Sequence, residues 1–371
     1  MTSLAYEAPD PSAVGTRAHA TFSEAMFGGV LGCSVFYATW HTYYSAGWDE
    51  CFRPVLHSGG MSWPCVNFPS AGVDPWGQLV FLVTLLALAV WVTSVVLGFV
   101  VHKRGTSDPS IVDRLWSIVP ACYMWYLYHA ACEGHGNGGN AYDEGTKDRL
   151  RLMATLVTAW AGRLTWNFWR KGGYSGGEDY RWVEVQSWMT PAQFEVFNLI
   201  FVCGAQMMVL LGICTPGAAV LLAGRDGQEH PLNAIDVAAA CAFSAHLMWE
   251  TIADNQMFDF QTQKYARRNA GKPPATEEEA DGFIQSGLWA LSRHPNYYCE
   301  VMMWWCVWLF SVAATHNLLG MSAIGAIWLT VLFVPPRASL DVTESISSRK
   351  YTKYAQYQEK VSRFVPLGNS Y

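Results

Sequence analysis

Apolar residues along the chain gather into segments long enough to cross a lipid bilayer. A transmembrane helix needs about 20 predominantly apolar residues. Windows of that length predict eight segments, at 27–46, 77–101, 115–132, 150–169, 195–222, 232–252, 286–314 and 317–334. The second and fifth are apolar almost throughout, whereas the first, third and fourth are aromatic-rich with polar insertions. We therefore expect an all-α, polytopic membrane protein with seven or eight transmembrane helices.

The segments that connect these spans alternate in charge. Segments 102–114, 170–193 and 253–285 and the C-terminal tail are rich in Lys and Arg, while 47–76 and 133–148 are acidic or nearly neutral. Basic loops usually lie in the cytoplasm. With eight spans, this pattern predicts that both termini are cytosolic.

Composition supports a membrane protein and excludes other classes. The chain of 371 residues is 51% hydrophobic and 15% charged, against about 25% charged residues in soluble proteins. A net charge of −6 offers no basic surface for nucleic acid. The start of the chain lacks the pattern of a cleaved signal peptide. The ten cysteines form no zinc or redox motif, although Cys51 and Cys65 share a predicted exterior loop and could form a disulfide.

The chain shows one marked change in composition, the hydrophilic loop "NAGKPPATEEEADG" at 269–282. No soluble segment is long enough to fold alone. We divide the chain into residues 1–110, a polar segment followed by two spans, and residues 111–371, a membrane domain with a cytosolic tail.

A first polar face lies on the predicted fourth span. Arg163, Asn167 and Arg170 follow i, i+4 and i+7 spacing, which places them on one side of a helix. Ionisable residues within spans are costly and usually functional. The alternative is that Arg170 extends to the interface while Arg163 has a structural partner.

A second polar face lies on the predicted sixth span, where His246, Glu250 and Asp254 are four residues apart. These side chains could ligate a metal, anchor neighbouring arginines or bind the polar atoms of a cofactor. Because no second ligand cluster accompanies them, we favour the last two and expect no metal. Three polar residues extend this face toward the cytoplasm: Gln256, Gln261 and Lys264.

The third polar face belongs to "GLWALSRHPNYYCE", residues 287–300. Arg293, Asn296 or Tyr297, and Glu300 share one side of a helix. Pro295 lacks a backbone N–H, so it either starts a helix or breaks one. The alternative to a functional site is a helix start with interfacial anchors.

All three faces end on the predicted cytoplasmic side. They predict a pocket that opens to the cytosol, with Arg and Lys at its rim and an apolar, aromatic interior. Such a pocket suits a phosphorylated soluble cofactor that meets a lipid-dissolved substrate. The glycine-rich "GGYSGGEDYRW" at 172–182 follows a helix instead of a strand, so it matches no phosphate-binding motif and is better explained as a tight turn.

Five segments in order resemble the steroid 5-alpha-reductase C-terminal family, in its broad branch of membrane proteins of largely unassigned function. They are "DRLWSIVPACYMW" (113–125), "RLTWNFWRKGGYSGGEDYRW" (163–182), "WETIADNQMFDFQ" (249–261), "GLWALSRHPNYYCE" and "YTKYAQYQEKVSRFVP" (351–366). The resemblance covers about residues 111 to 366. Cys299 stands where the family usually has glycine.

The resemblance implies a membrane fold that holds NADPH in a cytosol-facing cavity and reduces an activated carbon–carbon double bond of a steroid or another lipid. Asn296 and Glu300 would hold the nicotinamide carboxamide, with support from Arg293 and His294. The remaining cofactor contacts would come from Asp254 and Gln256, from the polar faces carrying Arg163, Asn167, Arg170 and Lys264, and, at the phosphates, from Arg181 with Arg349 or Tyr351.

The implied reaction is hydride transfer to the β-carbon of a conjugated carbonyl while a polar donor stabilises the developing enolate. Candidates for that donor are Tyr123, Tyr126 and Tyr297. We expect an internal membrane such as the endoplasmic reticulum. Two alternatives stay open: an S-adenosylmethionine-dependent methyltransferase of the isoprenylcysteine carboxyl methyltransferase type, which shares an "RHP-Y-G" motif, and a non-catalytic lipid-binding protein.

Overall fold

The computed structural model describes residues 75–135, 137, 140–174, 180–336 and 338–367, of which 180 and 181 are described by their backbone alone. The described chain folds into helices without a β-strand, which confirms the all-α prediction. The predicted span 27–46, together with Cys51 and Cys65, lies outside the described residues. The chain divides into two compact units: residues 1–233 with 310–325, and residues 234–309 with 326–371.

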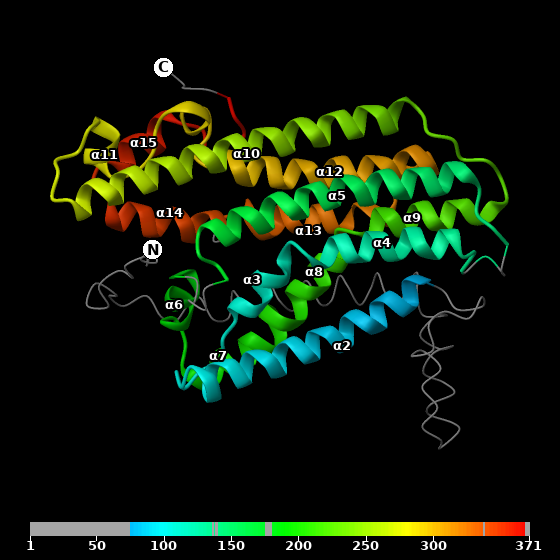
Figure 1. The fold of residues 1–371 in the computed structure, drawn as a ribbon, viewed down its shortest axis with the longest axis horizontal. Helices are drawn as coiled ribbons and strands as arrows, with labels where there is room; N and C mark the ends of the chain where they lie inside the picture. The colour runs from blue at the N-terminus through cyan, green and yellow to red at the C-terminus, as the bar shows by residue number, and fades with distance from the viewer. Residues whose placement is uncertain (1–74, 136, 138–139, 175–179, 337, 368–371) are drawn as a thin grey trace. The chain divides into compact units, whose positions relative to one another are not determined.

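Unit one contains most of the shorter helices (Figure 1). They are α2 (Pro75–Val95) continued by the π-helix η2 (Val96–Val101), α3 (Ser110–Trp116), α4 (Val119–Cys132), α5 (Glu144–Arg170), α6 (Tyr180–Gln186), α7 (Pro191–Phe197), the π-helix η3 (Asn198–Ala205), α8 (Gln206–Gly212), α9 (Thr215–Ala223) and the 3₁₀ turns η4 (Gly224–Asp226) and η6 (Met321–Ala323). Asp143 begins α5 as its N-cap, accepting a hydrogen bond from the backbone N–H of Thr146.

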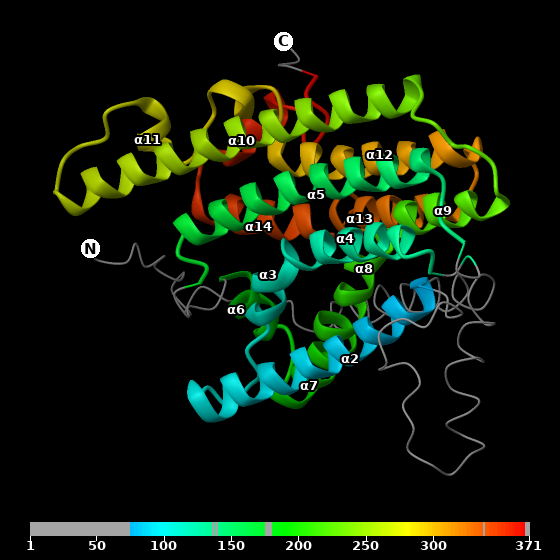
Figure 2. The same ribbon diagram turned by 45° about the vertical axis from the view of Figure 1, so that its right-hand side comes forward.

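Two helices of unit one, α4 and α5, run side by side, as both views show (Figure 2). Met124 and Leu127 of α4 and Leu150 and Trp160 of α5 are fully buried in the core. At Gly217 of α9, an added Cβ would lie 2.9 Å from side-chain atoms of both α4 residues. The α4–α5 pair is therefore a close-packed platform on which α9 rests.

Unit two is built on two long helices. Its elements are α10 (Ala234–Asn269), α11 (Glu277–Asp281), the 3₁₀ turn η5 (Gly287–Ala290), α12 (Pro295–Thr315, whose last residues belong to unit one), α13 (Ile324–Phe333, whose first two residues belong to unit one), α14 (Ser339–Lys350) and α15 (Tyr354–Lys360). His246 of α10 lies beside Tyr298 of α12, with ring centroids 6.0 Å apart. On α13, Thr330 accepts a hydrogen bond of 3.2 Å from Trp305 of α12.

Within the described residues, three helices are long and apolar enough to cross a membrane: Pro75–Val101, Pro191–Gly212 and Pro295–Thr315. Membrane character is thus supported. The span predicted at 195–222 is present as Pro191–Gly212 but ends earlier than predicted, because the chain turns at Ile213 and Cys214 and restarts as α9 with Pro216 in its first turn. The span predicted at 286–314 begins too early: Pro295 starts the helix and does not break it.

Candidate functional site

The first part of the motif is a tight turn held against α10. Gly287 has φ +62°, in the left-handed region that favours glycine. An added Cβ there would lie 2.5 Å from the Gln256 amide. The Gln256 Oε1 accepts a hydrogen bond from the Leu288 backbone N–H at 3.0 Å, and the Trp289 indole donates to the Ala253 carbonyl at 3.0 Å. Gln256, expected from the resemblance to contact the cofactor, therefore fixes the turn that precedes Arg293.

Arg293 is the centre of a buried hydrogen-bond network. Its Nε and Nη2 donate to the two carboxylate oxygens of Glu344 at 2.6 and 3.2 Å. Its Nη1 donates to the carbonyls of Gln358 and Val361, each at 2.7 Å. Its backbone N–H donates to the Ser362 carbonyl at 2.8 Å. Arg293 therefore ties the motif to α14 and to the C-terminal segment.

Glu344 receives two further hydrogen bonds, from His294 Nε2 at 3.1 Å and from the Gln358 amide at 3.0 Å. Burial by itself would raise the pKa of Glu344, but the bonds from His294 and Arg293 outweigh it and lower the pKa to about 2. Burial lowers the pKa of His294 below its usual 6.5, against the opposing effect of Glu344. At neutral pH the network holds one carboxylate, one guanidinium and a neutral imidazole.

The C-terminal segment 354–364 folds directly onto the motif. The Ser292 hydroxyl donates to the Phe364 carbonyl at 2.8 Å, and the Tyr357 hydroxyl donates to the Trp289 carbonyl at 2.5 Å. Phe283 centres a cluster of apolar and aromatic residues beside these bonds. Its members are Tyr351, Tyr354, Tyr357 and Val361. Residues far apart in the sequence therefore build one polar site with an aromatic support.

Three buried polar atoms on or near the motif have no hydrogen-bond partner among the described residues. They are Asn296 Oδ1, an acceptor in the first turn of α12, Trp249 Nε1, a donor on α10, and Arg363 Nε, a donor in the C-terminal segment. Trp249 lies between His246 and Ala253, which contact α12 and η5, so the three share one helix face. Such orphaned atoms are rare in folded proteins and call for a ligand or water.

The other carboxylates expected at the cofactor site are buried in unit two. Glu300 is 8% exposed and accepts a hydrogen bond from the Trp304 indole at 3.0 Å. Asp254 on α10 is 3% exposed. Among the described residues, no group of three His, Cys, Asp or Glu side chains is placed to hold a metal ion. The histidine and carboxylates of α10 therefore form no such group.

Lys264, also expected at the cofactor, lies at the other end of the network. It donates to the Gly282 carbonyl at 2.8 Å, and its Nζ is 5.7 Å from the ring centre of Tyr351. Burial, together with the neighbouring Lys350 and Arg268, lowers the pKa of Lys264 to about 8. Arg349 is exposed on α14. This region therefore gathers several basic side chains around Lys264.

Six of the predicted site residues belong to unit one, and the side chains of five of them are described. Arg170 donates a hydrogen bond to Asn167 Oδ1 at 2.9 Å. Arg163 lies one helical turn before Asn167 on α5. On α4, Tyr126 donates to Gln78 at 2.6 Å, while Tyr123 is buried. Each stays a prediction as a cofactor or substrate contact.

Two further predicted residues need separate mention. The side chain of Arg181 lies outside the described residues. Tyr297 belongs to unit two, where its ring lies edge-on to His294 and Phe333, with centroids 5.8 and 5.0 Å away. Of the three tyrosines predicted to act as donors, Tyr297 is the one that the structure places within the motif network.

Sequence reasoning missed Glu344 and Trp249. Glu344 follows the fully buried Leu340 by four residues, so both lie on the inner face of α14. A carboxylate at such a position is a signal of a buried ion pair. Trp249 is one of 18 tryptophans, and no sequence pattern separates it from those that only pack.

Comparisons with known proteins place these residues in a wider group. The profile of a family described as "Protein of unknown function (DUF1295)" matches residues 98–361. An uncharacterized protein of Schizosaccharomyces pombe, C594.04c, is 33% identical over 293 residues, which cover 77% of this chain and 79% of the yeast protein. No solved structure matches the chain.

Proposed function

We propose a function for this chain, which belongs to the family of unknown function DUF1295: it binds NADPH at the SRHPNY motif and reduces a conjugated carbon–carbon double bond. The substrate is a steroid or another lipid dissolved in the membrane. The resemblance to the steroid 5-alpha-reductase family suggests this chemistry. The geometry of unit two supports it independently.

The observation that carries the proposal is which polar atoms of the motif already have hydrogen-bond partners in the described part of the chain and which do not. Arg293 donates hydrogen bonds to Glu344 and to the C-terminal segment, and His294 donates one to Glu344, so both residues support the site structurally. Asn296 Oδ1, directly after them, is a buried acceptor without a partner among the described residues. A primary carboxamide carries the N–H donors that such an acceptor needs.

Trp249 adds the complementary group. Its indole N–H is a buried donor without a partner among the described residues, and a carboxamide also carries a carbonyl that accepts. The acceptor on α12 and the donor on α10 are thus the two kinds of group that a nicotinamide amide needs. Glu300 lies one turn after Asn296 on the same helix face. These residues fit the cofactor that the resemblance implies.

The chemistry divides between the cofactor and this chain. When bound, NADPH supplies a hydride to the β-carbon of the conjugated carbonyl. Tyr297 is our choice for the hydroxyl that stabilises the enolate oxygen and supplies the proton, because it packs against His294 of the same network. The buried Arg293–Glu344 pair keeps the first turn of α12 in one orientation.

A thermal-shift series tests the cofactor. The purified full chain in detergent is heated alone and with NADPH, NADH or S-adenosylmethionine, and the unfolding midpoint is measured. Selective stabilisation by NADPH is expected, because a ligand stabilises the state that binds it. Stabilisation by S-adenosylmethionine alone would instead support the methyltransferase, and no shift with any of the three would support a non-catalytic protein.

Asn296→Ala tests whether Asn296 Oδ1, which has no partner among the described residues, binds the cofactor. We expect it to weaken NADPH binding by about 1–3 kcal/mol, the cost of leaving a carboxamide hydrogen bond unmade, which is roughly five- to hundredfold in Kd. Asn269→Ala is the matched control, because Asn269 is exposed at the end of α10. Equal affinities of the two variants, measured by fluorescence titration of NADPH, would remove Asn296 from the cofactor site.

A further inference from the structure

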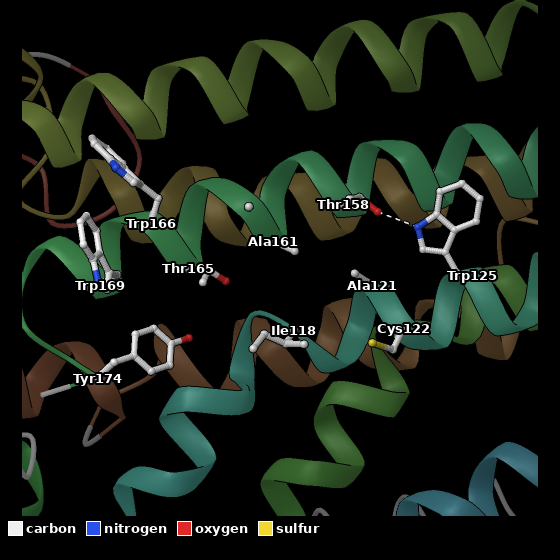
Figure 3. A pocket seen from close by; sticks show the side chains of 11 residues that line it. Ile118, Ala121, Cys122, Trp125, Thr158, Ala161, Thr165, Trp166, Trp169 and Tyr174 are labelled. Carbon is white, nitrogen blue, oxygen red and sulfur yellow. Dashed lines mark hydrogen bonds between the residues drawn. The ribbon is translucent and has the colours of Figure 1, made fainter. Parts of the chain in front are cut away.

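Unit one carries an apolar groove that the proposed reaction does not use. Its volume is about 640 Å³ and it runs between α4 and α5 (Figure 3). Ala121 on α4 and Ala161 and Gly162 on α5 are the small residues along it. An added Cβ at Gly162 would meet no atom within 4 Å. The groove is therefore open space beside a helix, of a size that suits a ligand chain.

Aromatic residues mark the two ends of the groove. Trp166, Trp169 and Tyr174 line one end, and Trp125 lines the other, where its indole donates to Thr158 at 2.8 Å (Figure 3). The tryptophans are 39–64% exposed. Exposed aromatic residues at the ends of apolar helices are typical of the membrane–water interface. In a membrane protein, such a surface is covered by lipid.

The end formed by Trp166 and Tyr174 is also cationic. The Arg170 guanidinium lies 4.2 Å from the centre of the Trp166 ring. The Tyr174 hydroxyl donates to the backbone carbonyl of Arg114 at 3.1 Å, and the exposed Lys171 follows Arg170. Next to Arg114, the carboxylate of Asp113 accepts a hydrogen bond of 2.7 Å from the Trp182 indole.

An apolar groove with one cationic, aromatic end matches an amphipathic anion. Arginine binds phosphate through paired N–H donors more strongly than it binds a neutral headgroup. The groove interior offers little besides the hydroxyls of Thr158 and Thr165, so it suits a hydrocarbon chain. We propose that the groove between α4 and α5 binds one anionic phospholipid, with an acyl chain along Gly162 and the phosphate beside Arg170 and Arg114.

The groove shares no lining residue with the NADPH site proposed at the motif, although Arg170 beside it stays a predicted cofactor contact. All of its lining residues belong to unit one, and none belongs to the motif at 287–300. Loss of lipid binding therefore leaves the cofactor proposal standing, and the reverse holds as well. Lipid binding and NADPH binding are measured in separate experiments.

The test is lipid titration of the full chain in detergent, followed by native mass spectrometry. The probes are phosphatidylglycerol, phosphatidylcholine and oleate. Gly162→Leu adds a side chain to the groove at a position where a Cβ meets no atom within 4 Å, and it removes a helix-weakening glycine, so we expect it to fold. Gly162→Ala also removes the helix-weakening glycine but fills less of the groove. Ala159→Leu places the same side chain at an exposed position of α5 outside the groove.

We expect the unmodified chain to retain phosphatidylglycerol in preference to the other two probes. Gly162→Leu should weaken that binding about tenfold, the loss of about two buried methylene groups, whereas Gly162→Ala weakens it less and Ala159→Leu leaves it unchanged. Arg170→Gln should remove the preference for phosphatidylglycerol over phosphatidylcholine while phosphatidylcholine binding stays as it was.

Three results overturn the proposal. The first is no retained phosphatidylglycerol on the unmodified chain, and the second is equal retention by Gly162→Leu and Ala159→Leu. The third uses Cys122, an exposed thiol in the groove. If a photo-crosslinker on Cys122 joins to residues 1–74 and not to lipid, the groove is covered by the chain's own N-terminal part.

Discussion

Removal of the Glu344 carboxylate should release the C-terminal segment from the motif. Glu344→Ala deletes the acceptor of four hydrogen bonds: two from Arg293, one from His294 and one from Gln358. Arg293 keeps its two bonds to the carbonyls of segment 354–364 but loses its counter-charge in a buried position. The variant therefore leaves a buried cation only partly compensated.

Two independent routes give the magnitude. Breaking a buried ion pair by removing one partner typically costs about 3–5 kcal/mol. A carboxyl group whose pKa falls from 4.5 to about 2 on folding contributes about 3 kcal/mol above both values. The two agree, so we expect a local cost of about 3 kcal/mol, which is roughly a hundredfold change in the opening equilibrium.

Hydrogen exchange measured by mass spectrometry on peptides that cover 354–364 is the assay. Exchange there should rise about a hundredfold in Glu344→Ala, while α5 peptides of unit one keep their protection. Glu359→Ala is the control, because Glu359 is an exposed carboxylate on the same segment. If both variants exchange at the same rate, the Arg293–Glu344 pair does not hold the tail and the reasoning is refuted.

Two further predictions concern the same network. The first is its acid sensitivity: the pKa of Glu344 is depressed in the folded state, so its stabilisation is complete above pH 4.5 and is lost as the pH falls toward 2. The lowered pKa of His294 means that the unfolded chain binds a proton first, so stability also falls as the pH drops through 6.5. Exchange of segment 354–364 against pH should show both steps, and His294→Gln should abolish only the upper one. The second is Gly287→Ala, which should lower the unfolding midpoint more than Gly271→Ala; both glycines have φ +62°, but only at Gly287 does a Cβ collide with Gln256. Equal midpoints would show that the Gln256 contact yields without cost.

Local pattern was enough to predict much of the fold. The uncharged run 77–101 coincides with α2 and η2, and the i, i+4 spacing of Arg163 and Asn167 falls on one helix, α5. Pro295 starts α12, one of the two options that its missing N–H allowed. These features depend on residues within a few helical turns of one another, so the sequence carries them directly.

The support of the motif could not be predicted in the same way. Glu344 is 51 residues from Arg293 along the chain, and nothing in its local sequence names its partner. The break at Ile213 was missed because apolar residues continue through it, and hydropathy does not register a turn whose polar groups are satisfied within the protein. Long-range pairing and buried turns are properties of tertiary structure.

The network also changes how the motif residues should be weighed as functional residues. Arg293 looks like the strongest candidate in the sequence, because it is a charge beside an apolar helix. In the structure its donors already have protein partners, so a substitution there perturbs the tail before it perturbs any ligand. Asn296 is less conspicuous, yet its buried Oδ1 is one of the atoms that folding leaves without a partner among the described residues. Because an unmade buried hydrogen bond costs free energy, the position that the fold leaves unsatisfied is the better indicator of where a ligand binds.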